Sequence, residues 1–374
     1  MIPNEIYQQT VLAHFGPIRP FLEDASVSEI MINGPDQIYI ERRGCLERVE
    51  ARFSSRDTLL AALRNVSQFI GKLIDEEHPI LEGRLPDGSR LEAVIPPAFP
   101  DGPCVAIRRF FRETLTVNRL VEFGSLTSVA AEALRAFVIA KANIVVAGGT
   151  GSGKTSLLNA LSGFIPESER VIVIEDAREV QLQQPHVIQL EARPPDPRGR
   201  GAVSIRDLFR ATLRLRPDRV VVGEIRGGEA LDIVQAMTSG HGGCMGTLHA
   251  SFPRDTMNRL ETMALMNDIG LPLAALRGQI GSGLNLIVQV SRYRDGSRKI
   301  SHITEVAGYD AQAQSYDLRD LFVREYDGFD ADNRVRSTLV PTGVLPSFLP
   351  QLEEHGMTLP TAMLERVAAG LPSA

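Results

Sequence analysis

The sequence has no tryptophan, only three cysteines and no long apolar run. The cysteines, Cys45, Cys104 and Cys244, are far apart, which excludes a disulfide framework and a cysteine-rich zinc module. The best apolar stretch, 136–147, contains Lys141 and is shorter than the ~20 residues of a membrane-spanning helix. The first residues also lack the basic start and apolar core of a secretory signal. We therefore expect a soluble, cytoplasmic chain without direct membrane insertion.

Neither sign of charge dominates, because 46 acidic and 40 basic residues give a formal net charge of -6. Nucleic-acid binding needs clustered positive charge, so this balance argues mildly against nucleic acid as the main partner, although local arginine clusters exist. The 374 residues, 43% of them hydrophobic, predict a globular protein with two or three domains.

Residues 1–112 have the pattern of an α+β domain. Apolar residues at helical spacing predict a helix within 55–74. Short strand-like runs separated by turn formers lie at 28–32, 37–41, 45–49, 91–95 and 105–110. We expect a linker at 113–124.

The pattern changes in residues 125–374. Apolar runs without polar alternation, at 144–147, 171–174 and 220–222, are typical of strands covered on both faces. Helical stretches separate them, which predicts a doubly wound, mainly parallel α/β sheet. Turn formers at Asp295-Gly296 and Asp327-Gly328 predict hairpins in the last part of the chain. That part is either the end of the α/β domain or a small appendage.

The segment after the first buried strand fits the phosphate-binding loop G-x-x-x-x-G-K-(S/T) and precedes a helix-forming stretch. Its glycines let backbone N–H groups converge on phosphates at a helix N-terminus. Lys154 then reaches the β- and γ-phosphates, and the Thr155 hydroxyl helps to hold Mg²⁺. This context predicts a nucleoside triphosphate site, in a P-loop NTPase of the RecA-like type. The predicted nucleotide-binding residues are Gly148, Gly149, Thr150, Gly151, Ser152, Gly153, Lys154, Thr155 and Ser156.

Carboxylates follow the other two buried strands. Glu175 and Asp176 suit Mg²⁺ or water positioning, with Glu175 assisting the metal through a water. The third strand stands in the place of a Walker B strand, but Gly223 replaces the usual aspartate and Glu224 follows it. Glu224 is the candidate general base that polarises the attacking water.

Two histidines, His241 and His249, lie among four glycines. A zinc site would need a third ligand at suitable spacing, and the sequence offers none. We favour a mobile loop that senses the γ-phosphate, because histidine donates to phosphate oxygens and glycine lets the backbone come close. The alternative is a structural turn in which the histidines form hydrogen bonds within the protein.

These four segments, in this order, resemble the Walker A, Asp box, atypical Walker B and His box of the secretion ATPase superfamily, which serves type II and type IV secretion and type IV pili. The stretches 28–35, 84–90 and 214–219 resemble most the CpaF type, the motor ATPase of the tight-adherence (Tad) pilus. The resemblance implies a homo-hexameric ring of two-domain subunits with ATP and Mg²⁺ held between the domains. It also implies an inner-membrane platform protein as partner, and hence peripheral association with that membrane.

The resemblance further implies that arginines bring positive charge to the phosphates, sometimes across a subunit boundary. Arg108 is the preferred candidate catalytic arginine, beside Lys154 and Glu224, and its neighbour Arg109 points to the opposite face of a strand. Arg206, Arg210 and Arg214 recur every four residues and are expected on one helix face. For each arginine, a solvated or ion-paired surface role is an equal alternative. The remaining candidates are Arg84, Arg90 and Arg216.

We therefore predict an ATP-hydrolysing motor that couples turnover to pilin polymerisation, with retraction left open. The nearest alternative is a type IV secretion traffic ATPase, which shares the fold and all four boxes. Two others are a nucleotide-gated scaffold without hydrolysis and a DNA-translocating ring.

Overall fold

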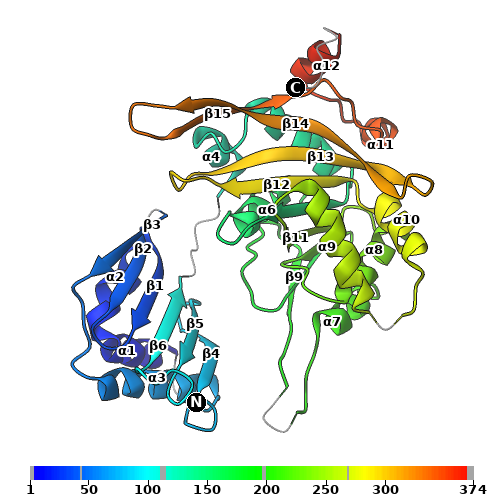
Figure 1. Ribbon diagram of the computed structural model, residues 1–374. Coiled ribbons are helices and arrows are strands. Elements are labelled where there is room, and N and C mark those ends of the chain that lie inside the picture. The colour runs from blue at the N-terminus through cyan, green and yellow to red at the C-terminus, as the bar shows by residue number, and fades with distance from the viewer. Residues whose placement is uncertain (1–3, 43, 110–114, 196–198, 268, 369–374) are drawn as a thin grey trace. The chain divides into compact units, whose positions relative to one another are not determined.

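The computed structural model describes residues 4–42, 44–109, 115–195, 199–267 and 269–368. The chain divides into two compact units, 1–113 and 114–374, which we call the N-terminal and C-terminal units (Figure 1). Within the described ranges, no helix combines the length and the apolar character that crossing a membrane requires.

The N-terminal unit is one antiparallel sheet of six strands packed on helices, in the order β3-β2-β1-β6-β5-β4. Its core consists of alternate strand residues and one face of the longest helix. The elements are α1 (Asn4–His14), a 3-10 turn (Gly16–Ile18), α2 (Arg19–Glu23), β1 (Val27–Asn33), β2 (Ile38–Arg42), β3 (Cys45–Val49), α3 (Arg56–Ile70), β4 (Ile80–Arg84), β5 (Arg90–Val94) and β6 (Cys104–Arg108).

The predicted helix within 55–74 is α3, and local chemistry sets its ends. The Ser55 side chain accepts a hydrogen bond from the backbone N–H of Thr58 at 3.2 Å, which caps the first turn. Gly71 takes a left-handed φ of 68°, so the helix ends before residue 74. The five predicted strands are present, while α1, α2 and β4 were not predicted. Phe110, at the end of the last predicted run, lies outside the described residues.

The C-terminal unit contains a nine-stranded sheet in the order β15-β14-β13-β12-β7-β11-β10-β8-β9 (Figure 1). The six strands from β12 to β9 are parallel, and β13, β14 and β15 add an antiparallel extension. The strands are β7 (Ile144–Gly148), β8 (Val171–Glu175), β9 (Val187–Glu191), β10 (Arg219–Val222), β11 (Met245–His249), β12 (Leu286–Arg292), β13 (Arg298–Asp310), β14 (Ser315–Phe329) and β15 (Val335–Pro341).

Helices cover both faces of this sheet. Val146 packs with α5 and α6, whereas Val145 packs with the helices α7 to α10 on the other face. All five residues of β7 are buried, as expected for a strand without polar alternation. This confirms the predicted doubly wound, mainly parallel fold. The helices are α4 (Val117–Glu122), α5 (Ser128–Ile139), α6 (Lys154–Ser162), α7 (Ile205–Thr212), α8 (Glu229–Thr238), α9 (Pro253–Leu265), α10 (Leu273–Gly283), α11 (Leu349–Glu354) and α12 (Thr361–Ala368).

Two expectations about the connecting segments need correction. The predicted linker at 113–124 contains α4, because Val117 and Leu120 lie one helical turn apart and are buried in the core of the C-terminal unit. The dipeptide Asp327-Gly328 is not a hairpin turn. It lies inside β14, where a bulge at Gly328 lets the strand continue, and the turn follows at 330–334.

The last part of the chain belongs to the same sheet and is no appendage. β12 pairs in parallel with β7, and β13 pairs with β12 through the predicted turn at Asp295-Gly296. Because β7, β8, β10, β11 and β12 are parallel, their carboxyl ends lie at one edge of the sheet. Everything that follows these strands therefore gathers at that edge.

Candidate nucleotide-binding site

The phosphate loop joins β7 to α6 at the carboxyl edge of the sheet. Gly151 and Gly153 have φ values of 68° and 93°, a left-handed conformation that side chains other than glycine rarely adopt. A Cβ atom at Gly148 would lie 2.5 Å from both the Ser152 hydroxyl and the Val290 carbonyl oxygen. The glycines of the motif are thus required by the loop's own geometry, and Lys154 begins the helix behind it.

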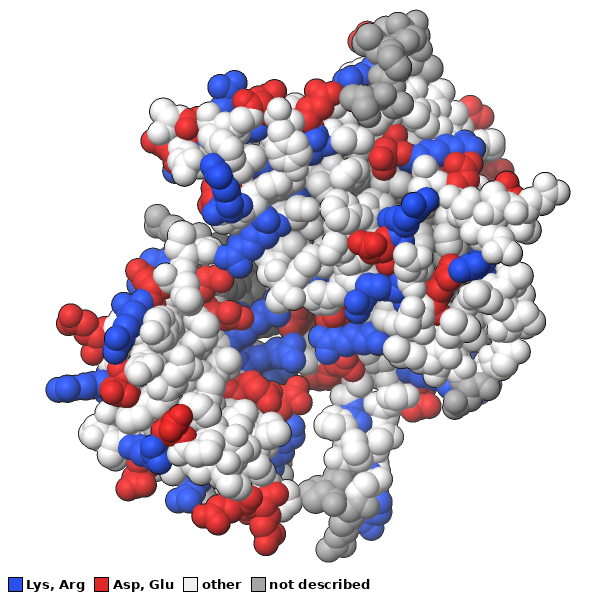
Figure 2. Space-filling view, in the orientation of Figure 1, with Lys and Arg blue, Asp and Glu red and all other residues white. Residues whose placement is uncertain are grey.

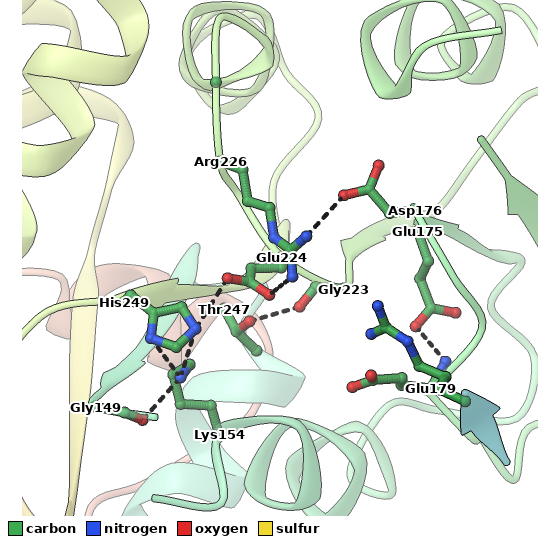
Figure 3. A network of polar contacts seen from close by, with 12 residues as sticks. Gly149, Lys154, Glu175, Asp176, Glu179, Gly223, Glu224, Arg226, Thr247 and His249 are labelled. Carbon is green, nitrogen blue, oxygen red and sulfur yellow. Dashed lines mark hydrogen bonds and ion pairs between the residues drawn. The ribbon is translucent and has the colours of Figure 1, made fainter. Parts of the chain in front are cut away.

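A chain of polar contacts starts at Lys154 (Figure 3). Its Nζ donates to the Gly149 carbonyl oxygen at 3.0 Å and lies 3.3 Å from both ring nitrogens of His249. The Nε2 atom of His249 lies 3.0 Å from Oε1 of Glu224, and Nη2 of Arg226 lies 2.6 Å from Oε2 of the same carboxylate. The predicted lysine, histidine and glutamate are therefore brought together.

The contacts assign charge states to this chain. Burial and the Lys154 charge lower the pKa of His249, against the opposing effect of Glu224, so the imidazole is neutral at pH 7. A neutral ring can accept from Lys154 and donate to Glu224 at the same time. Burial alone would raise the pKa of Glu224, but the hydrogen bond and charge of Arg226 bring this pKa below its ordinary value. Glu224 is therefore ionised.

Backbone contacts fix Glu224 on both sides. The Thr247 hydroxyl donates to the Gly223 carbonyl oxygen at 2.6 Å, and the Ile225 N–H donates to the Thr247 carbonyl oxygen at 2.9 Å. Both bonds connect the end of β10 to β11. Glu224 is thus held against β11, the strand that also carries His249.

The structure explains why glycine stands where a Walker B strand usually has aspartate. A Cβ atom at Gly223 would lie 2.6 Å from Cγ of Glu175, so the Glu175 side chain already fills that space. Glu175 is buried, and its Oε1 accepts from the backbone N–H groups of Glu179 and Val180 at 2.8 Å each. Asp176 lies 3.4 Å from the Arg226 guanidinium.

The residues at this edge fit Mg²⁺ through oxygen donors. Thr155, in the first turn of α6, supplies a hydroxyl next to Lys154. The carboxylate of Glu175 is fixed at the end of β8 by the two N–H groups it accepts from, which suits a contact through water. Among the described residues, no group of three or more histidine, cysteine or acidic side chains is arranged to hold a metal by itself.

The predicted mobile loop around the two histidines needs correction. Met245–His249 is the strand β11, between β7 and β10, and four of its five residues are buried. His249 pairs with Gly148 at the carboxyl edge, while His241 precedes the strand and lies at the opposite edge. Gly243 there has a φ of 80° and packs against the buried Arg219. The structure does not bring His241 to the phosphate loop.

Three of the candidate arginines lie side by side in the N-terminal unit. Arg84 pairs with Arg90 across β4 and β5, and Arg90 pairs with Arg108 across β5 and β6. Directly paired residues of antiparallel strands point to the same face, so the three side chains form a row. Arg109 points away, and its Nη1 donates to the carbonyl oxygens of Phe21 and Asp24. Acidic neighbours balance part of this charge, since Arg90 lies 3.7 Å from Glu82 and Glu29 pairs with Arg108 across β1 and β6.

Arg214 and Arg216 lie elsewhere. Both are exposed and precede β10, at the edge of the sheet opposite to the phosphate loop. The expected row along one helix face is limited to Arg206 and Arg210, which bind Asp232 of α8 at 3.0 and 3.1 Å. The helix α7 ends at Thr212, so Arg214 is outside it.

Some arginines at this edge, Arg226 and Arg298 among them, were not among the predicted site residues. Arg226 lies two residues after Glu224, so the sequence pattern that indicated Glu224 could also have indicated it. Arg298 begins β13, and its Nε donates to the Gly151 carbonyl oxygen at 2.8 Å. No sequence signal connects positions 147 residues apart, because the contact depends on the pairing of β12 with β7.

The phosphate loop, the parallel sheet and the carboxylate after β10 define a P-loop NTPase. Residues 11–317 match the family described as Type II/IV secretion system protein. The chain therefore belongs to the type II/IV secretion ATPase family, and it is an ATPase.

Similar proteins support this assignment. A putative conjugal transfer protein of Mycobacterium tuberculosis H37Rv, Rv3659c, is 32% identical over 82% of this chain and 88% of its own length. The type IV secretion system protein PtlH of Bordetella pertussis is 36% identical over 76% of this chain and 91% of its own length. The crystal structure of the pilus retraction motor PilT with bound ADP has a TM-score of 0.53 at 18% identity, over 97% of this chain and 94% of that one. This last likeness shows the fold alone.

Proposed function

We propose that this chain is the hexameric ATPase that powers a type IV secretion or related pilus machine. The observation that carries the proposal is the continuous set of contacts from Lys154 through His249 and Glu224 to Arg226 at the carboxyl edge of the sheet. Such a set combines a phosphate-binding cation with an ionised carboxylate, the two functions that ATP hydrolysis needs.

In the proposed reaction, the loop 148–156 binds the phosphates of ATP. Bound Mg²⁺ would supply charge neutralisation, held by the Thr155 hydroxyl, with Glu175 acting through water. Lys154 leaves the Gly149 carbonyl for the β- and γ-phosphates. Glu224 orients the attacking water and accepts its proton.

Glu224 must exchange partners before it can act. Its two oxygens are engaged by Arg226 and His249, and the same contacts keep its pKa low, which makes the carboxylate a weak base. A γ-phosphate offers Arg226 a more highly charged partner than one carboxylate. We infer that Arg226 moves to the phosphate and releases Glu224 for the water.

We propose that the N-terminal unit also binds phosphate groups, through its row of Arg84, Arg90 and Arg108. Arg108, the preferred residue, is exposed at the end of β6, with Arg90 and Arg84 next to it. Because guanidinium groups bind phosphate oxygens in pairs, such a row suits the terminal phosphates.

Two machines are compatible with this motor. The motifs at 28–35, 84–90 and 214–219 favour a Tad-type pilus, in which ATP turnover drives pilin addition through an inner-membrane platform protein. The relatives named for conjugal transfer and type IV secretion favour a secretion channel as the alternative.

Capture of membrane proteins with the full chain as bait would separate these alternatives. A platform protein recovered with wild type, and with the Lys154→Ala variant as a control for turnover, would support the pilus machine. Recovery of conjugation-channel proteins instead would assign the chain to secretion. DNA-stimulated phosphate release without a membrane partner would contradict both.

A further inference from the structure

A cavity of about 450 Å³ opens beside the phosphate loop, entirely within the C-terminal unit. Its volume lies in the range of roughly 300–1,000 Å³ that is usual for small-molecule sites. Gly149 and Thr150 of the loop line one side, and His249 lines the end of β11. The remaining wall is α9, through Asn258 and Arg259. The helix after the His box thus borders the space next to the loop that binds phosphates.

Among the described residues that line this cavity, Arg259 carries the one cationic side chain. It is exposed, and it makes no ion pair with any residue that the structure describes. Asp255, one helical turn earlier on the same face, brings the opposing charge into the wall. A phosphate group in the cavity would therefore depend on Arg259 to balance the repulsion from Asp255.

Arg259 and His249 line the same cavity, and His249 is a residue that Lys154 contacts. The charge of Arg259 is among those that lower the pKa of His249, together with the larger effects of burial and Lys154.

We propose that Arg259 binds the terminal phosphate of ATP from α9, so that the site distinguishes ATP from ADP. A guanidinium presents a planar pair of N–H donors, which matches two phosphate oxygens. Hydrolysis followed by phosphate release removes this partner. The inference uses ATP hydrolysis alone and does not depend on which secretion machine the chain serves.

The contact between Arg259 and the terminal phosphate would also couple the nucleotide state to the rest of the C-terminal unit. Glu261, on α9, binds Arg277 of α10 through two bonds of 3.0 and 3.1 Å. This two-bond pair holds the two helices together, so a pull on Arg259 would act on α9 and α10 as one body. The terminal phosphate would thus bias the position of a helix pair.

The test compares binding of ADP and of a non-hydrolysable ATP analogue to the full chain. Arg259→Ala should weaken binding of the analogue roughly 10- to 100-fold, the usual worth of a hydrogen-bonded charge, while ADP binding changes less than about threefold. The affinity of Arg259→Lys for the analogue should lie between those of wild type and Arg259→Ala, because one ammonium replaces a planar pair of donors.

Arg254→Ala is the matched control, since Arg254 is an exposed arginine of the same helix that lines a different cavity. It should bind both nucleotides as wild type does. Equal losses of ADP and analogue in Arg259→Ala, or an unchanged affinity for the analogue, would overturn the proposal. Thermal unfolding without nucleotide checks the fold of the variant. Arg259→Ala removes an exposed side chain, so its melting temperature should equal that of wild type.

Discussion

Replacing Glu224 by Gln removes the proposed base and keeps the size of the side chain, at the cost of one acceptor for His249. The amide oxygen can still accept from Arg226, whose side chain is 52% exposed, so solvent screens much of the lost charge pair. Glu224 itself is only 23% exposed, so we take the upper end of the range for surface pairs, about 1 kcal/mol, which limits the change in nucleotide affinity and in folding to about fivefold. Loss of general-base catalysis lowers kcat by about 10²- to 10⁴-fold. The effect on the chemical step should therefore far exceed the effect on binding.

Phosphate release at saturating Mg·ATP measures kcat, and titration with a fluorescent ATP analogue measures affinity. The control is Asp317→Asn, which makes the same carboxylate-to-amide change in another exposed arginine pair, on β14. We expect its kcat to stay within about threefold of wild type. Turnover of Glu224→Gln within tenfold of wild type would refute the base assignment, even if affinity behaved as expected.

Two other predictions concern folding. The pKa of His249 is below its ordinary 6.5, so the unfolded chain binds the proton more readily; the free energy of unfolding should fall as pH drops below about 6.5. Urea unfolding at about pH 7.5 and about pH 5.5 should show a smaller fall in His249→Asn than in wild type. Gly243→Ala would place a Cβ 2.2 Å from Nη1 of Arg219 and disturb a buried ion pair, for a loss of about 3 kcal/mol or more. Gly240→Ala, with a φ of 93° and open space around it, should cost only about 1–2 kcal/mol; equal losses would contradict the crowding argument.

The sequence predicted the fold wherever a pattern was local. The buried strands β7, β8 and β10 are continuous apolar runs, and the phosphate loop has glycines at positions that need left-handed backbone. The strand β11 was missed because glycine, threonine and histidine interrupt its apolar character. Burial between two neighbours overrides the low strand propensity of its glycine.

Site residues were predictable where a motif places them in the loop or turn that follows a buried strand. Lys154 and Glu224 met this condition, and the structure places both at the carboxyl edge. The row of Arg84, Arg90 and Arg108 depends on strand register, which turn lengths and bulges decide and which composition does not reveal. Acidic and basic side chains are interspersed over the visible surface of both units, so charge alone did not mark these arginines (Figure 2).

The two ends of β11 have different roles, and this limits how the nucleotide signal can travel. Just before its first residue, Gly243 packs against Arg219 of β10, whose side chain is fully buried and paired with Glu169. At the other end, His249 contacts Lys154. A strand that follows such a closely packed segment and lies between two parallel neighbours cannot shift without disrupting the core. A change at the γ-phosphate should therefore leave β11 in place and act through the element that follows it, the helix α9.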